Sequence, residues 1–323
     1  MHGTAVLDGL SLRWSLIEKV TERPDVASEY LYDNGMREFR AYQSGLLGDL
    51  APGMVAPRAY GFQESADGTL TLWLEDVSPS ERWAPEQFID TARHLGRFAG
   101  RWLHRPPEYP WLFRDWIDRH SQPAAVADGL EIIQATRGRS DIEGRLEPGL
   151  QDAALLIEDQ PLYRSALEGL PQTLCHHDAV RANLFSRVRY GARETVAIDW
   201  EMVGPGAIGA DLASLLFSSV RRGDLSTASL LAIKPRALEA YAVGATEMGA
   251  AVEPTEVRLG FSAAVSLRWS LVRDVVVALA SGRPVRRGSA PQEPPETALD
   301  ELVALTHVLL DSAIEARQLA AAR

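Results

Sequence analysis

Two patterns of apolar residues divide the chain. Short apolar runs at residues 14–20 and 71–77 have the composition of β-strands. From residue 80 onward, apolar residues such as Phe88, Ala92 and Leu95 recur at helical spacing, after a proline early in the first turn. The sequence therefore predicts a strand-containing beginning followed by a mainly helical remainder.

Most of the remaining elements are expected to be helices. Residues 111–120 are expected to form one helix, and the polar stretch 121–149 a connecting region with one helix in it. The segment 281–295, rich in Pro, Gly and Arg, is a flexible loop by composition. Further helices are predicted at 212–220, 226–248, 254–280 and 296–321.

A β-hairpin is predicted within the helical part. The short apolar segment 171–175 leads into a polar loop, and a strand begins after it. Residues 189–194 provide a turn before a second strand at 195–198. Because a hairpin returns its second strand beside its first, we expect Asp199 to lie close to Asn183 and Asp178.

The polar residues around this hairpin have the composition of a phosphoryl-transfer site. The loop reads His176-His177-Asp178-Ala179-Val180-Arg181-Ala182-Asn183, and the second strand ends in Ile198-Asp199-Trp200-Glu201. Such a site needs one carboxylate to take a hydroxyl proton and an Asp/Asn pair to hold magnesium on ATP. We therefore predict that Asp178 is the base or hydroxyl-orienting group, and that Asn183 and Asp199 bind Mg²⁺.

The pattern H-x-D-x-x-x-x-N followed by I-D-W-E resembles the aminoglycoside phosphotransferase and choline kinase branch of the protein-kinase-like superfamily. The resemblance implies an α+β, two-lobed protein-kinase-like fold. Residues 1–77 would form a small sheet-based N-lobe that binds ATP. Residues 78–323 would form a helical C-lobe with the catalytic loop and the acceptor pocket.

The resemblance also implies roles for residues in and after the loop. His176 is expected to stabilise the loop through hydrogen bonds. Arg181 is expected either to neutralise developing charge or to form a salt bridge within the loop. His177 stands where the family usually has a small residue, so it could crowd or contact the substrate. Asp211, in the segment Asp211-Leu212-Ala213, would brace the loop, or alternatively cap the helix that follows.

A kinase-like fold also needs an upstream lysine and glutamate, and the chain supplies both. Lys19, on the strand 14–20, would contact the ATP phosphates. Glu38 follows the start of a predicted helix at Met36 and would hold Lys19 in place. The last strand of the N-lobe leads into a hinge, where Glu75 and Val77 would pair with adenine through backbone groups.

The Gly-rich hairpin that covers the phosphates in such folds is not evident. Only residues 1–13 precede the lysine strand, with single glycines at Gly3 and Gly9. Either the first strand is missing from the start of the chain, or nucleotide is bound with a reduced lid.

The net charge, the cysteine content and the lengths of the apolar runs limit the expected partners and location. The net charge of −11 argues against nucleic acid and permits a cationic acceptor; Trp200 and Glu201 could line such a site or pack under the loop. Cys175 is the only cysteine, so no intramolecular disulfide is possible and a cytoplasmic location is expected. No export signal or membrane-spanning run is apparent.

We therefore expect an ATP- and Mg²⁺-dependent kinase that phosphorylates a hydroxyl of a small, cationic molecule, either aminoglycoside-like or an amino alcohol. One alternative is a pseudokinase that binds nucleotide or a partner without turnover. Transfer of a nucleotidyl group is less well supported, because the base Asp178 is present. The sequence leaves open the identity of the acceptor, the choice between ATP and GTP, and the oligomeric state.

Overall fold

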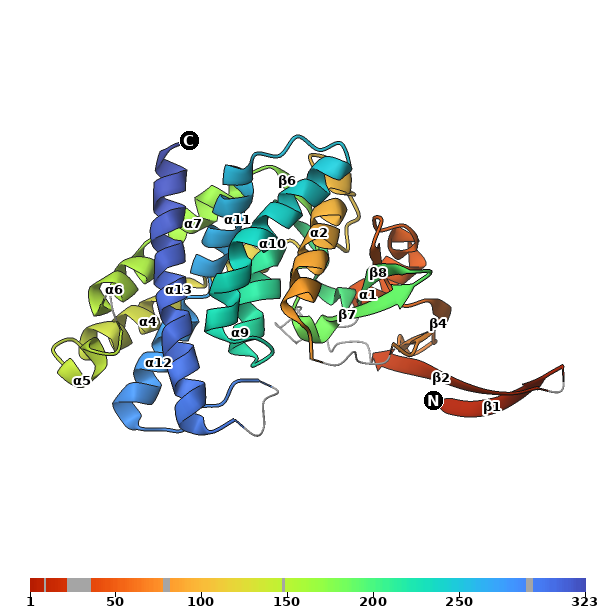
Figure 1. Ribbon diagram of the computed structural model, residues 1–323, viewed down its shortest axis with the longest axis horizontal. Coiled ribbons are helices and arrows are strands. Elements are labelled where there is room, and N and C mark those ends of the chain that lie inside the picture. The colour runs from red at the N-terminus through yellow and green to blue at the C-terminus, as the bar shows by residue number, and fades with distance from the viewer. Residues whose placement is uncertain (9, 22–35, 78–81, 147–148, 289–292) are drawn as a thin grey trace.

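The computed structural model describes residues 1–8, 10–21, 36–77, 82–146, 149–288 and 293–323. A sheet-containing region lies at one end of the molecule and a larger helical region at the other (Figure 1). This arrangement confirms the predicted α+β, kinase-like fold class. The predictions that concern Gly9, residues 80–81 and residues 289–292 lie outside the described residues.

The N-terminal sheet has four strands in the order β1-β2-β5-β4. These strands are β1 (His2–Leu7), β2 (Leu10–Thr21), β4 (Ala59–Glu64) and β5 (Leu70–Glu75). Alternate residues of β5 are buried, namely Leu70, Leu72 and Leu74, and they form a small core with Phe39 of helix α1 (Met36–Gln43). One face of the sheet is therefore covered by the helix that carries Glu38.

The first hairpin does not form a lid over the site. Strand β1 pairs antiparallel with β2, so that Gly3 lies opposite Trp14, and the amino group of Met1 donates to the carbonyl of Leu16 at 2.7 Å. The paired residues Leu7 and Leu10 are therefore at the end of the hairpin farthest from Lys19, and β1 and β2 extend away from the helical region in Figure 1. Among the described residues, no glycine-rich turn covers Lys19.

Helices α2 (Pro85–Trp102) and α10 (Thr227–Glu247) form the centre of the helical region. Their backbones approach closely at Gly96. A Cβ atom there would lie only 2.0 Å from the carbonyl oxygen of Tyr241, so the position requires glycine. The other helices are α3 (Trp116–His120), α4 (Pro123–Ala135), α5 (Ser140–Glu143), α6 (Leu150–Glu158), α7 (Gln160–Glu168), α11 (Pro254–Ser266), α12 (Ser270–Ser281) and α13 (Pro295–Ala321).

The predicted hairpin is confirmed as β7 (Leu184–Arg189) and β8 (Ala192–Ala197), with a shorter turn and an earlier second strand than expected. Strand β8 also pairs in parallel with the short strand β3 (Met54–Val55). A second pair, β6 (Gln172–Cys175) with β9 (Gly204–Ala207), holds the segments that precede the loop and follow the hairpin. Chain segments far apart in sequence are thus fixed around residues 176–183.

Three predicted elements were wrong in their extent. The helix expected at 254–280 is broken at residues 267–269 into α11 and α12, and Arg268 in the break turns back to bond the carbonyl of Ala264. The region 121–149 holds two helices, α4 and α5, separated at Gly138, whose φ of 82° is left-handed. Of residues 111–120, only 116–120 are helical, since the Phe113 N–H bonds the Val203 carbonyl.

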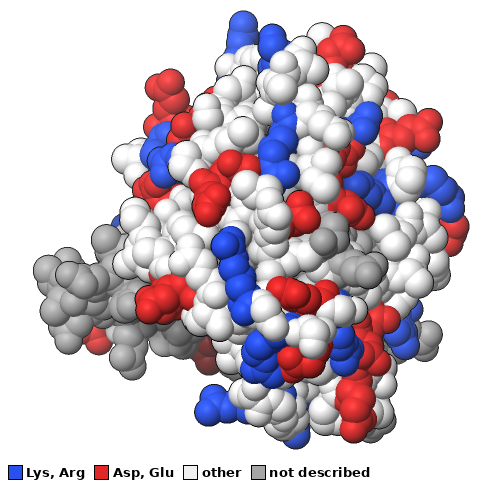
Figure 2. Space-filling view, turned by 90° about the vertical axis from the view of Figure 1, so that its left-hand side faces the viewer, with Lys and Arg blue, Asp and Glu red and all other residues white. Residues whose placement is uncertain are grey.

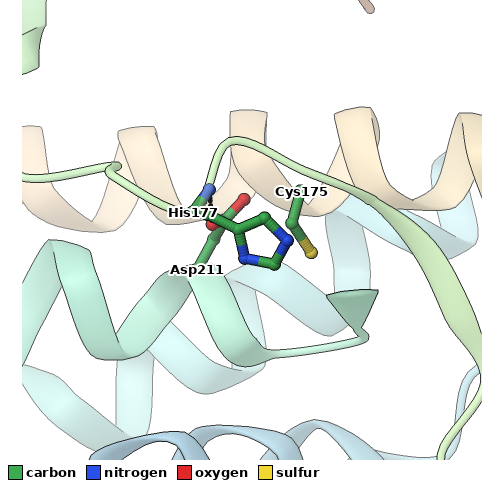
Figure 3. A group of neighbouring side chains, drawn as sticks. All are labelled: Cys175, His177 and Asp211. Carbon is green, nitrogen blue, oxygen red and sulfur yellow. Dashed lines mark hydrogen bonds between the residues drawn. The ribbon is translucent and has the colours of Figure 1, made fainter. Parts of the chain in front are cut away.

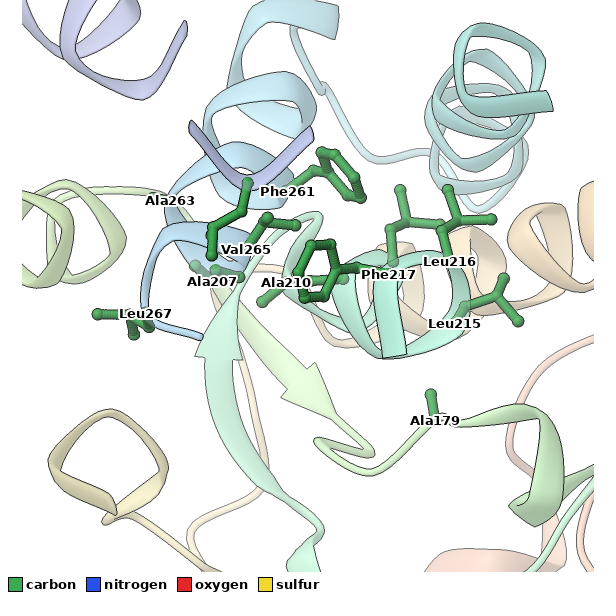
Figure 4. Close-up of a cluster of buried hydrophobic side chains, with 14 of the residues drawn as sticks. Ala179, Ala207, Ala210, Leu215, Leu216, Phe217, Phe261, Ala263, Val265 and Leu267 are labelled. Atoms are coloured by element: carbon green, nitrogen blue, oxygen red, sulfur yellow. The ribbon is translucent and has the colours of Figure 1, made fainter. Parts of the chain in front are cut away.

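The main core lies directly beneath the catalytic loop. The segment expected as one helix at 212–220 consists of the short helices α8 (Ala210–Leu212) and α9 (Ser219–Arg221) and a π-helical segment, η4 (Ala213–Ser218), between them. Figure 4 shows Leu215, Leu216 and Phe217 of η4 between the loop residue Ala179 and helix α11, where Phe261 and Val265 are buried. The floor of the loop is therefore closely packed and rigid.

No helix in the described part of the chain has the length and apolar character that a membrane span requires. On the face of the helical region shown in Figure 2, acidic and basic side chains are interspersed. The acidic excess of the whole chain is therefore not gathered into one patch on that face.

Candidate active site

The catalytic loop is closed on itself by Asn183. The side-chain amide of Asn183 donates from Nδ2 to the Asp178 carboxylate at 2.8 Å and to the Asp178 carbonyl at 3.0 Å. Both side chains are only partly buried. Because the amide nitrogen is used in this way, the amide oxygen of Asn183 is left to face other ligands.

The hairpin brings Asp199 to the same place. The Ile198 N–H donates to the Asn183 carbonyl at 2.9 Å, and Asp199 follows directly. Asp199 has a left-handed backbone with φ of 61°, which is uncommon for a residue other than glycine but tolerated by aspartate. Its side chain is 42 % exposed, so the carboxylate is accessible to solvent.

Lys19 and Glu38, which the family resemblance paired, are in contact. The Lys19 ammonium forms an ion pair with Glu38 and lies 3.5 Å from a carboxylate oxygen of Asp199. Burial alone would lower the pKa of Lys19, but the two carboxylates outweigh it and raise that pKa above its ordinary value. A permanently charged ammonium therefore lies beside Asp199.

Glu38 also supports the backbone of Asp199. Its second carboxylate oxygen accepts hydrogen bonds from the N–H groups of Asp199, at 3.1 Å, and Trp200, at 3.4 Å. The side chain is only 2 % exposed, so these bonds form in a poorly solvated environment. One buried carboxylate thus fixes both the lysine and the turn that presents Asp199.

Glu201 has a role that sequence reasoning missed. Its carboxylate accepts from the Glu38 N–H at 3.2 Å in the first turn of α1, and it pairs with Arg37 at 3.1 Å. Glu201 is therefore a cap for the helix that carries Glu38. The only sequence signal was an acid directly after Asp199-Trp200, and its target lies 163 residues away.

The idea that Trp200 and Glu201 line an acceptor site is wrong. Trp200 is fully buried, its ring tilted against those of His176 and Phe98, and Glu201 is 4 % exposed. Trp200 packs under the loop, which was the alternative weighed for it, whereas Glu201 contacts α1.

Replacing Glu201 with alanine is expected to lower the free energy of unfolding by about 1–3 kcal/mol, because α1 loses its cap and the partly buried Arg37 loses this ion pair. Urea titration measures the change. The matched control is Glu239→Ala, at an exposed position of α10, for which a change within about 0.5 kcal/mol is expected. An equal effect of the two substitutions would contradict the capping role.

Asp211 braces the catalytic loop from below. Its two carboxylate oxygens accept from the N–H groups of His176 and His177, each at 2.8 Å. Figure 3 shows the bond from His177. Asp211 lies inside α8, whose N-cap is Gly209, so the alternative of a helix-capping aspartate is wrong. The loop backbone is therefore held by charge-assisted hydrogen bonds.

The two loop histidines are structural. His176 Nε2 lies 2.9 Å from the Ile198 carbonyl, and His177 Nε2 lies 3.0 Å from the Pro205 carbonyl; since a carbonyl only accepts, both nitrogens carry a proton. His177 is 4 % exposed and points into the protein, with φ of 62°. It therefore packs behind the loop, where it also lines a cavity of about 220 Å³.

Cys175, His177 and Asp211, drawn in Figure 3, lie side by side. Their possible ligand atoms are within 4.8 Å of one another. Asp211 is occupied by two backbone N–H groups and His177 Nε2 by a carbonyl. Burial raises the pKa of the Cys175 thiol well above its usual value, which disfavours the thiolate that a metal needs. We interpret this cluster as part of the loop support.

Arg181 lies at the edge of a cavity. Its guanidinium donates to the Leu184 carbonyl at 3.0 Å and lies 4.6 Å from the centroid of the Trp83 ring. Burial lowers the pKa of Arg181, and Asp224 acts in the opposite direction. The cavity measures about 380 Å³ and is lined by Arg82, Trp83, Arg181, Gly223, Asp224, Arg287 and Glu293.

Glu75 links strands. Its N–H donates to the Arg58 carbonyl at 2.8 Å, and its carboxylate pairs with Arg187 of β7 at 2.7 Å. The N–H of Glu75 is therefore used within the sheet, and the expected pairing of backbone groups of Glu75 and Val77 with adenine stays a prediction. Val77 follows the end of β5 and is partly buried.

Comparison with known proteins identifies the family of this chain. The sequence model of the phosphotransferase enzyme family matches residues 27–251, which is more than half of the chain. A search of curated proteins finds no match.

Two solved structures show the same fold. An aminoglycoside phosphotransferase from Alicyclobacillus acidocaldarius superposes with a TM-score of 0.56 at 16% identity, over 99% of this chain and 93% of that one. A microcompartment-associated aminopropanol kinase gives 0.51 at 18% identity, over 98% and 94%. The family match confirms the resemblance drawn from the loop and hairpin motifs: the chain belongs to the phosphotransferase enzyme family.

Proposed function

We propose that the protein is a kinase that transfers the γ-phosphate of ATP, with Mg²⁺, to a hydroxyl group of a small molecule. The observation that carries this proposal is the continuous set of contacts from Glu38 and Lys19 to Asp199, and from Asp199 through the hairpin to Asn183 and Asp178. A family of phosphotransferases needs this combination of a lysine, metal ligands and a carboxylate at one place.

The donor atoms suit magnesium. Mg²⁺ prefers carboxylate and carbonyl-type oxygens, and the half-exposed Asp199 carboxylate and the remaining amide oxygen of Asn183 are of that kind. When bound there, the ion would neutralise charge on the phosphates of ATP. Lys19 would contact the phosphates, and Glu38 would keep its ammonium in place.

Asp178 would act on the acceptor. Asn183 contacts one of its carboxylate oxygens, which leaves the other to accept a hydrogen bond from the acceptor hydroxyl. As the hydroxyl oxygen bonds to the γ-phosphorus, its proton passes to Asp178, and the bond from the γ-phosphorus to the β,γ-bridging oxygen breaks to release ADP. The rigid loop floor would keep the carboxylate aimed during this step.

The acceptor is proposed to be a small amino alcohol or an aminoglycoside-like molecule. The two structures above are named for an aminoglycoside and for aminopropanol, both of which carry amino and hydroxyl groups. The cavity beside Arg181 has the size of a small-molecule site. Its charges are mixed, with three arginines and two acids, so the proposed cationic character rests mainly on the net charge of −11.

The test is to measure ADP release with a panel of amino alcohols, aminoglycosides and neutral alcohols, with and without Mg²⁺. ADP release that requires both Mg²⁺ and one class of acceptor is expected. The absence of a glycine-rich turn over Lys19 among the described residues favours one alternative, a pseudokinase. ATP binding by calorimetry without turnover on any acceptor would support that alternative.

Replacing Lys19 with alanine is expected to impair ATP use more than stability. The Lys19 side chain is 39 % exposed but its partner Glu38 is only 2 % exposed, so the substitution should lower the free energy of unfolding by about 1–3 kcal/mol and still leave a folded protein. Thermal unfolding and the KM for ATP, measured on one preparation, separate the two effects. An unchanged KM and kcat would remove Lys19 from the nucleotide site.

A further inference from the structure

Arg268 is a buried cation whose position is unexplained by folding alone. It lies in the break between α11 and α12 and is 8 % exposed. No carboxylate of the described residues lies within ion-pair distance of its guanidinium. Burial lowers the pKa of Arg268 to about 10, while the carboxylates of Asp178 and Asp211 act against that shift. An unpaired buried charge is unfavourable for stability, so it calls for another explanation.

The guanidinium fork binds two serines of η4. Arg268 donates from Nη2 to Ser214 Oγ at 2.8 Å and from Nε to Ser218 Oγ at 3.3 Å. π-Helical segments are rare and often occur at functional sites. Here the segment directly follows α8, which contains Asp211, and it presents both hydroxyl groups to one arginine.

Ser214 carries this contact to the catalytic loop. Its hydroxyl donates to the carbonyl of His177 at 3.2 Å while accepting from Arg268. Ring contacts make a second connection, because the Arg268 guanidinium carbon lies 5.6 Å from the centroid of Trp116. The Trp116 ring is stacked on that of His177, with centroids 5.2 Å apart and planes inclined by 19°.

These contacts converge on His177. His177 has a left-handed backbone, which is uncommon for a residue other than glycine, and it directly precedes Asp178. Asp211 holds its N–H, Ser214 its carbonyl and Trp116 its ring. Of these three contacting residues, Arg268 touches Ser214 and Trp116.

A purely structural explanation accounts for one contact only. Arg268 Nη1 donates to the Ala264 carbonyl at 2.6 Å, near the C-terminal end of α11, where a cation is favourable. A lysine could supply that bond from a solvated position. The other guanidinium donors, Nε and Nη2, bond serines of η4, on the side of the catalytic loop.

We propose that Arg268 is a positioning residue for phosphoryl transfer: through Ser214 and Trp116 it holds His177 in its left-handed conformation and so aims Asp178 at the acceptor hydroxyl. The role of Asp178 in this statement rests on the proposed function. The restraint on the loop backbone can be measured independently of activity.

The test compares Arg268→Met with the control Arg317→Met. Arg317 pairs with Asp159 at 2.6 Å, and both residues lie outside the loop and its support. For Arg268→Met we expect amide exchange in residues 174–183 to accelerate about tenfold and kcat to fall about 10²-fold. The KM for ATP should stay the same, and Tm should stay the same or rise, since a buried unpaired charge is removed. For Arg317→Met we expect a lower Tm and unchanged loop exchange.

Unchanged loop exchange in Arg268→Met would overturn the inference, as would a fall in Tm with exchange accelerated throughout the protein. If Arg268→Met does not fold, Ser214→Ala removes only the connecting hydroxyl and should accelerate the same loop amides. A wild-type protein that transfers phosphate to no acceptor would refute the proposed function, and loop exchange would still decide whether Arg268 restrains His177.

Discussion

Replacing Asp178 with asparagine is expected to lower kcat by roughly 10²–10⁴-fold, the usual contribution of a positioned general base. The affinity for ATP should change little, because the asparagine keeps the shape of the side chain. Its amide oxygen can still accept the hydrogen bond from Asn183 Nδ2. Nucleotide binding and turnover would thus be separated.

The measurement is a calorimetric titration with ATP and a transfer assay on the same preparation, with an acceptor found by ADP release. Asp128→Asn, an exposed position of α4, is a matched control that should leave both quantities unchanged. Equal turnover in Asp178→Asn and the wild type would show that another group serves as the base.

Replacing Asp199 with alanine is expected to abolish the Mg²⁺-dependent part of ATP binding and to reduce turnover below detection. The carboxylate is the charged half of the proposed metal-binding pair, and without it the phosphate charge is not neutralised. The fold should persist, since the Asp199 side chain is 42 % exposed and its contact with Lys19 is long, at 3.5 Å. ATP titrations with and without Mg²⁺ measure the loss.

Glu86→Ala serves as the control for that substitution. Glu86 pairs with Arg236 on the surface, with both side chains more than half exposed, so its removal should affect neither ATP binding nor turnover. If the Asp199→Ala protein is folded and retains Mg²⁺-dependent binding, Asp199 is not a metal ligand.

The sequence was most informative where the relevant contacts are local. Asp178 and Asn183 lie on one loop, and a tight hairpin returns Asp199 to them, so a motif and a turn prediction were enough to bring these residues together. Lys19 and Glu38 could be paired only through the family resemblance, because nothing in the chain between them reveals that a helix packs on the sheet.

The supporting residues could not be found in this way. Glu201 caps a helix 163 residues earlier in the chain, and Arg268 reaches η4 because a turn breaks an apolar run that has continuous helical spacing. His177 was expected to be able to crowd or contact a substrate, because it stands where the family usually has a small residue. Its left-handed backbone turns the ring inward instead, and this conformation has no signature in the sequence.

The central claim, transfer of the γ-phosphate to a hydroxyl group, is tested most directly by phosphorus NMR of a reaction containing ATP, Mg²⁺ and the acceptor found by ADP release. The account predicts a new phosphomonoester signal that grows in step with ADP. Formation of free phosphate and ADP alone, or of pyrophosphate with a nucleotidylated acceptor, would contradict it.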